Sequence, residues 1–83
     1  MNNNLSLVKD SFKELPNNIE AEQAVLGSIL VSNEIFDEIN TLISNKNFYD
    51  PMHQKIFEAI ESLIYKGMLA NPITLKNYFE NQK

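Results

Sequence analysis

The sequence predicts an all-α fold, a compact bundle of about four to five short helices joined by short loops. Apolar residues recur at helical spacing in several successive segments, and no segment shows the two-residue alternation of a strand. Leu, Ile, Val and Phe occupy 26 of the 83 positions. That content suits one small core, with a stability on the order of 3–5 kcal/mol. Residues 16–83 are expected to form this domain.

Residues 1–15 are expected to be a flexible N-terminal arm. The arm opens with Met1 and three asparagines, which is typical of a disordered end. Leu5, Val8 and Phe12 recur at helical spacing within it, so a short helix is the alternative.

The first helix of the domain is predicted at about 18–31. Pro16 precedes an asparagine cap at Asn17, and Glu20 follows three residues later, which is capping-box spacing. Carboxylates in the first turn, from Glu20 and Glu22, suit the positive end of the helix dipole. One face of this helix is expected to carry Ile19, Gln23, Leu26 and Leu30.

A second helix is predicted at about 33–45, where Asn45-Lys46-Asn47 ends it. Its apolar residues follow the i, i+1, i+4, i+7, i+8 pattern of one helix face. They are Ile35, Phe36, Ile39, Leu42 and Ile43.

The third helix, at about 51–66, has clear signals at both ends. Asp50 can cap it, and Pro51 suits the first helical position, where the missing N–H is not needed. Lys66-Gly67 favours a C-terminus, because the cation lies near the negative dipole end and Gly can turn left-handed. The apolar face is expected to contain Met52, Ile56, Phe57, Ile60, Leu63 and Ile64.

A fourth helix is predicted to start at Asn71-Pro72-Ile73-Thr74, with Leu75, Tyr78 and Phe79 on its apolar side. The predicted core of the whole domain combines one or more residues from each helix. Its members are Ile19, Leu26, Leu30, Phe36, Ile39, Ile43, Ile56, Phe57, Ile60 and Phe79.

Composition limits the compartments in which the protein can work and the partners that it can bind. The chain has no cysteine, no apolar run near the roughly 20 residues of a membrane span, and no secretory signal pattern. We therefore expect a cytoplasmic protein without a membrane partner. Its net charge is −4, with seven lysines and no arginine. Because phosphate binding needs a positive patch, direct binding of nucleic acid is not expected.

No catalytic, cofactor or metal site is predicted. Gly27 and Gly67 are the only glycines, and neither is followed by Lys-Ser or Lys-Thr, so a phosphate-binding loop is absent. Glu20 and Glu22 do not face each other on a helix, and their place in the first turn explains both. His53 is interpreted as a packed or capping residue at a helix start; an interface role and a catalytic or metal role are the alternatives.

The tyrosines are the candidate interface residues. A tyrosine at a helix edge is often half-buried with a wet hydroxyl, and it is also a common anchor in protein interfaces. The candidates are Tyr65, Tyr78 and Tyr49.

Three segments together resemble one known family. The string from Pro16 to Gly27 reads P-x-x-I-E-A-E-Q-x-V-L-G and resembles the opening of the N-terminal domain of DnaB-type replicative DNA helicases. Phe48-Tyr49, four residues ahead of His53 and followed by Ile56-Phe57, is similar to the family's F-Y-x-x-x-H-x-x-I-F segment. The segment 71–75 resembles its [D/N]-x-[I/V]-T-[L/V] step. The three segments occur in the family's order.

The resemblance implies a small helical domain at the head of a ring-shaped hexameric helicase. In this family the N-terminal domains pair and form a collar, a trimer of dimers, on which the helicase-binding domain of primase docks. ATP and Mg²⁺ belong to the motor domains, whose motifs do not occur in residues 1–83. The family's domain normally continues into a helical hairpin, so the chain is expected to be a fragment truncated before that hairpin and the motor domain, with apolar surface uncovered on its third and fourth helices.

Two alternatives are kept. The helicase-binding helical domain of a primase shares a similar bundle, although the P-x-x-I-E-A-E-Q opening argues against it. A small DNA-binding helical domain should present basic residues on a recognition helix, and none of the predicted helices does.

Overall fold

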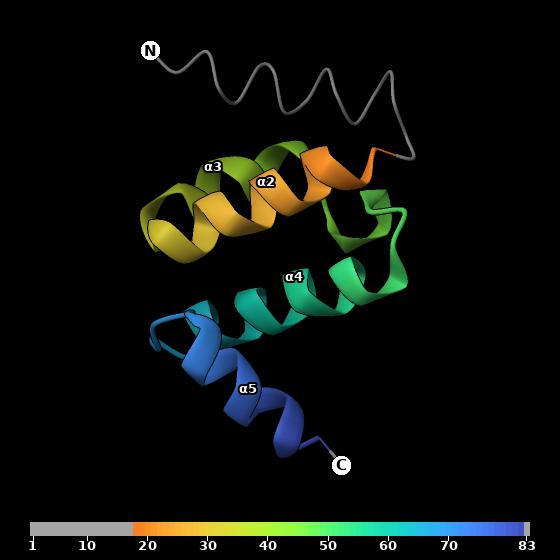
Figure 1. Ribbon diagram of the computed structural model, residues 1–83. Helices are drawn as coiled ribbons and strands as arrows, with labels where there is room; N and C mark the ends of the chain where they lie inside the picture. The colour runs from red at the N-terminus through yellow and green to blue at the C-terminus, as the bar shows by residue number, and fades with distance from the viewer. Residues whose placement is uncertain (1–17, 83) are drawn as a thin grey trace.

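The computed structural model describes residues 18–82, and every regular element in that range is helical (Figure 1). The all-α prediction is therefore confirmed for the described residues, whereas the predicted arm at 1–15 lies outside them. In chain order the elements are α2 (Ile19–Val31), the 3₁₀ turn η1 (Asn33–Ile35), α3 (Phe36–Leu42), the 3₁₀ turn η2 (Asn45–Asn47), α4 (Pro51–Tyr65) and α5 (Pro72–Glu80).

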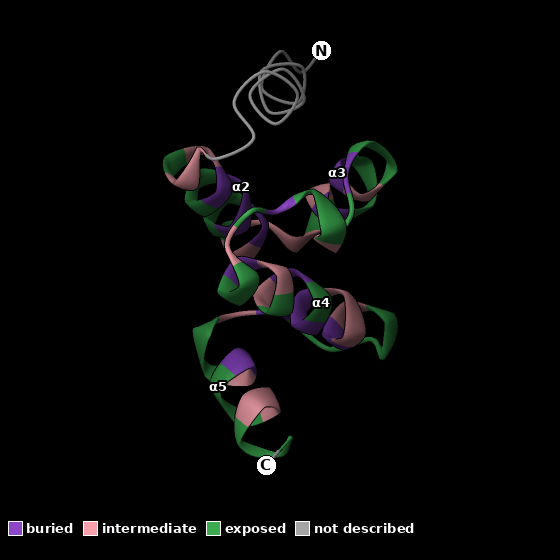
Figure 2. Ribbon diagram, turned by 90° about the vertical axis from the view of Figure 1, so that its right-hand side faces the viewer, coloured by how far each residue is buried: buried purple, intermediate pink, exposed green. Residues whose placement is uncertain are grey.

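The helices are arranged in three layers. Helices α2 and α3 lie on one side of α4, and α5 lies on the other (Figures 1 and 2). Helix α4 packs against α2, η2 and α5, so it is the central element of the bundle. Figure 2 shows that α5 keeps much of its surface exposed.

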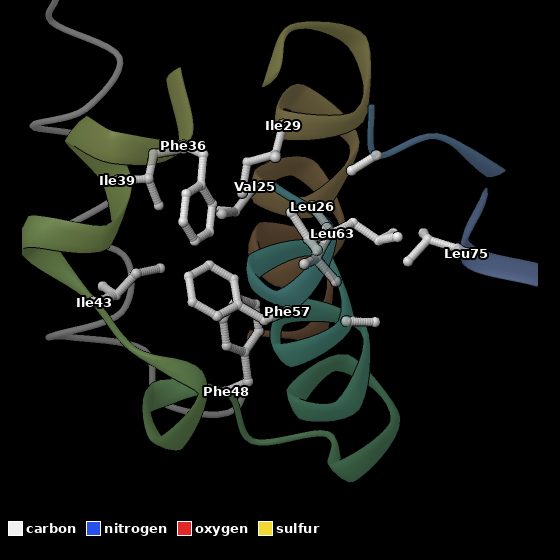
Figure 3. Packing of buried hydrophobic residues seen from close by; sticks show 13 residues of the cluster. Val25, Leu26, Ile29, Phe36, Ile39, Ile43, Phe48, Phe57, Leu63 and Leu75 are labelled. Atoms are coloured by element: carbon white, nitrogen blue, oxygen red, sulfur yellow. The ribbon is translucent and has the colours of Figure 1, made fainter. Parts of the chain in front are cut away.

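Three phenylalanine rings, each tilted against the next, occupy the centre of the core (Figure 3). They belong to Phe36, Phe57 and Phe48 and are called the phenylalanine stack. The ring of Phe57 on α4 lies 5.4 Å from Phe36 on α3 and 5.2 Å from Phe48, both at 40°. All three side chains are at most 1% exposed. Tilted ring pairs at such distances add to the stabilisation from area burial.

The remaining buried apolar residues of the core come from all four helices and from the segments between them. They are Val25, Leu26, Ile29, Ile39, Ile43, Ala59, Ile60, Leu63, Ala70 and Leu75. Of the predicted core residues, six are fully buried: Leu26, Phe36, Ile39, Ile43, Phe57 and Ile60. The other four are half-buried: Ile19, Leu30, Ile56 and Phe79.

Helix α2 differs from its prediction in its cap and its face. Asn18, rather than Asn17, caps the helix, and its Oδ1 accepts a hydrogen bond of 2.9 Å from the N–H of Ala21. Glu20 is therefore one position too early for the predicted capping box. The buried face consists of Glu22, Val25, Leu26 and Ile29, whereas the predicted member Gln23 is exposed.

The second predicted helix, 33–45, is wrong at its C-terminal end. Helix α3 stops at Leu42, which is 36% exposed, and Ile43 turns to an extended conformation (φ −140°, ψ 163°). The extended backbone brings the Ile43 side chain to 5% exposure. Residues 45–47 form the turn η2 instead of a simple helix end.

Helix α4 follows the predicted signals closely at its ends. The Asp50 carboxylate accepts from the N–H of Met52 at 2.8 Å, and Pro51 is the first helical residue. Gly67 adopts φ +78°, and its N–H donates to the carbonyl of Ile64 while Met68 donates to Leu63. This pair of bonds is a Schellman motif, which satisfies the last carbonyls of the helix. Met52, expected on the apolar face, is instead 56% exposed.

Helix α5 starts as predicted. The N–H of Thr74 donates to Oδ1 of Asn71, the N–H of Asn71 donates to Oγ1 of Thr74, and both bonds are 2.9 Å long. Leu75 is buried, and Tyr78 and Phe79 are half-buried against the core.

Candidate functional site

A buried carboxylate joins α2 to the start of α4. Glu22 is 1% exposed. Its oxygens accept from the backbone N–H of Tyr49 at 2.5 Å and of Asp50 at 3.3 Å. They also contact Nδ1 of His53 at 2.8 Å. Two of these partners are backbone N–H groups, and the third is the imidazole of His53, which donates when Nδ1 carries the proton.

His53 is a buried partner of that carboxylate. The side chain lies in the first turn of α4, is 8% exposed, and meets the ring of Phe48 edge-on at 6.5 Å. The tautomer with the proton on Nδ1 is assigned from this contact, because a carboxylate oxygen accepts hydrogen bonds. The interpretation of His53 as a packed residue agrees with this position, but its partner on α2 was not predicted.

The reading of Glu22 as a residue explained by the first helical turn is incomplete. Its position does place it near the positive end of α2, yet its partners lie 27 to 31 residues further along the chain. The sequence did contain a signal for this contact. Glu22 shares a helix face with Val25, Leu26 and Ile29, and a carboxylate on an apolar face requires a buried donor.

A second polar link fastens the opposite end of α2. The side-chain amide of Asn33 donates to the carbonyls of Ile29 at 2.8 Å and of Ala70 at 3.0 Å. The Oδ1 of Asn33 accepts from the N–H of Ala70 at 2.7 Å. Ala70 is fully buried, so Asn33 is the group that satisfies its backbone. The connection between α4 and α5 is thus held to the end of α2.

Replacing Asn33 by Ala is expected to lower the free energy of unfolding by about 1–3 kcal/mol, because the buried N–H of Ala70 loses its acceptor. Urea denaturation followed by circular dichroism would measure the change. Asn40→Ala is the matched control, since Asn40 makes only an exposed bond of 3.4 Å to the hydroxyl of Tyr65. The control should stay within about 0.5 kcal/mol of the parent; equal losses in both variants would contradict the role given to Asn33.

The three candidate interface tyrosines do not form one patch. Tyr49 is 59% exposed just before α4, and Tyr65 is 67% exposed at its last residue. Helix α4 separates them by roughly 22 Å at 1.5 Å per residue. Tyr78 lies on α5, half-buried, with its ring 5.5 Å from that of Phe79.

Other exposed apolar side chains were not singled out from the sequence. Met68, Leu69 and Ile73 are 48%, 62% and 71% exposed around the α4–α5 connection, and Val31 is 89% exposed at the end of α2. Single exposed apolar side chains are normal on a protein surface, so the three that are close in the chain, Met68, Leu69 and Ile73, are the ones that suggest a contact surface.

Within residues 18–82, no group of three or more His, Cys, Asp or Glu side chains is arranged to hold a metal ion. No helix in that range is both long and apolar enough to cross a membrane.

Comparison with known sequences shows the family. A profile described as the DnaB-like helicase N terminal domain matches residues 14–83. The chain is 40% identical over 83 residues to the replicative DNA helicase DnaB of Rickettsia typhi, covering 93% of this chain and 17% of the relative. It is 46% identical over 63 residues to that of Rickettsia prowazekii (76% and 13%) and 38% identical over 79 residues to that of Buchnera aphidicola (95% and 17%).

The chain belongs to the DnaB-like helicase N-terminal domain family, and the resemblance seen in the sequence is confirmed. It spans 13–17% of the length of these relatives. No solved structure matches it significantly.

Proposed function

We propose that this chain is the N-terminal collar domain of a hexameric replicative DNA helicase, and that it acts through protein–protein contacts. The observation that carries the proposal is the family match over residues 14–83. The relatives named above are replicative DNA helicases, so the parent protein is proposed to unwind duplex DNA at the replication fork in the cytoplasm.

The chemistry of unwinding is assigned to parts of the parent outside this chain. ATP and Mg²⁺ are proposed to bind a motor domain, and residues 1–83 are proposed to hold no catalytic or cofactor site. The buried polar groups support this division. Glu22, His53 and Asn33 are occupied in hydrogen bonds that join separate parts of the bundle, so these three groups serve the fold.

The proposed partners are further copies of the chain, as dimers within a hexameric collar, and the helicase-binding domain of primase. Exposed apolar side chains such as Tyr65 and Leu69 support protein partners. The net charge of −4 and the lack of arginine support a domain that does not bind nucleic acid directly.

Sedimentation equilibrium over a wide concentration range tests the proposal, first with the chain alone and then with the helicase-binding domain of primase added. Self-association or a mixed complex is the expected result. A monomer that ignores primase at every concentration would refute an interaction surface in residues 1–83. Tyr65→Ala should weaken the association seen, and Lys55→Ala, another exposed α4 residue, is the control.

A further inference from the structure

The segment Tyr49–His53 is held to the bundle mainly by polar contacts. Its large apolar side chains face solvent, with Tyr49 59% and Met52 56% exposed, and only His53 is buried. On either side of the segment the chain is anchored by buried rings, Phe48 before it and Phe57 after it. A stretch with so little apolar burial has low local stability unless another interaction holds it.

Glu22 supplies that interaction. Its carboxylate accepts hydrogen bonds from the N–H groups of Tyr49 and Asp50 and contacts Nδ1 of His53. Within the described part of the chain, the two backbone N–H groups have no helix carbonyl as a partner. The neighbouring carboxylates do not compete for these donors. Asp50 accepts from Met52 within its own helix cap, and Glu20 is exposed. One side chain of α2 therefore holds three donors of the segment.

We infer that Glu22 is a conformational latch, which closes the segment Tyr49–His53 against α2 and can release it while the rest of the core stays folded. The rest of the core has its own attachments. The link between Asn33 and Ala70 fastens the other end of α2. The rings of Phe36, Phe48 and Phe57 come from outside the segment and meet it in the edge-on contact between Phe48 and His53. While the latch is closed, Tyr49 and Met52 are presented at the surface in one fixed arrangement.

Native-state amide exchange of the 83-residue chain, followed by NMR in low concentrations of urea, tests the latch. The amides of Tyr49 and Asp50 should be protected, although their segment is largely exposed. Their exchange should depend only weakly on urea, whereas exchange of the Phe57 and Ile60 amides should depend on it steeply. Two results would overturn the inference: no protection at Tyr49 and Asp50, or the same urea dependence as the core amides.

The variant Glu22→Asp provides a second readout, because it keeps the charge and shortens the reach by one methylene. Protection at Tyr49 and Asp50 should fall roughly 10- to 100-fold, the range of a hydrogen bond to a charged group. Protection at Phe57 and Ile60 should fall by up to the same factor, because the bonds of Glu22 are broken in the locally opened state and in the unfolded chain alike. Glu20→Asp, in the same turn but exposed, should change none of the four. Unchanged protection at Tyr49 and Asp50 in Glu22→Asp would contradict the latch, and if this variant fails to fold, the urea series on the parent chain decides.

Discussion

Replacing Phe57 by Ala is expected to lower the free energy of unfolding by about 3–5 kcal/mol, as much as the whole stability expected of a core this size. Phe57 is 1% exposed and is the middle ring of the stack, so truncation removes its contacts with both Phe36 and Phe48. The variant should be largely unfolded at 25 °C, which far-UV circular dichroism and a thermal melt would show.

Met52→Ala is the control for this variant. Met52 lies on the same helix and is also a large apolar residue, but it is 56% exposed. Its removal should change stability by about 0.5 kcal/mol or less. If Phe57→Ala melts within a few degrees of the parent chain, the stack is not the centre of the core.

Replacing Glu22 by Gln is expected to lower the free energy of unfolding by about 1.5–3 kcal/mol. Gln has nearly the same shape, but it offers one acceptor oxygen and turns an NH₂ group toward a site whose protein partners are all donors. At least one buried N–H would lose its acceptor. Chemical denaturation with urea would measure the loss.

Glu20→Gln is the matched control for Glu22→Gln. The two glutamates are in the first turn of α2, and the substitution removes one charge from the helix dipole in each case, but Glu20 is exposed. The control should lose only a few tenths of a kcal/mol. If both variants lose the same small amount, the contribution of Glu22 is that of a first-turn charge, and its buried bonds add nothing measurable.

Helix ends were predictable where the signal is local. Asp50-Pro51 and Lys66-Gly67 determine their own backbone conformation through a cap, a fixed φ and a left-handed glycine, so α4 starts as predicted and ends within a residue of the predicted position. The same holds for Asn71 and Thr74 at the start of α5.

The end of α3 could not be predicted, because burial there competes with helical periodicity. The spacing of Ile39, Leu42 and Ile43 continues a helix face, yet the extended backbone at Ile43 buries its side chain in the core. The backbone conformation of Ile43 depends on packing against helices from elsewhere in the chain. The local spacing of apolar residues carries no information about that packing.

Only part of the candidate site could be predicted from the sequence, for a related reason. His53 was correctly placed at a helix start, and Glu22 in a first turn, but each was explained by its own helix. Their contact joins residues 31 positions apart. Two titratable residues that each lie on an apolar helix face, in a chain with a single histidine, are a pair worth testing before either is explained alone.

The location of the phenylalanine stack also bears on how fast the chain reaches its native state. All three rings come from residues 36–57, and most packed pairs of elements are neighbours along the chain. Little loop-closure entropy is lost in bringing such rings together, so they can form an early folding nucleus. Because most contacts join elements that are close in the chain, refolding is expected to take microseconds to milliseconds. The three rings can come together before α5 docks.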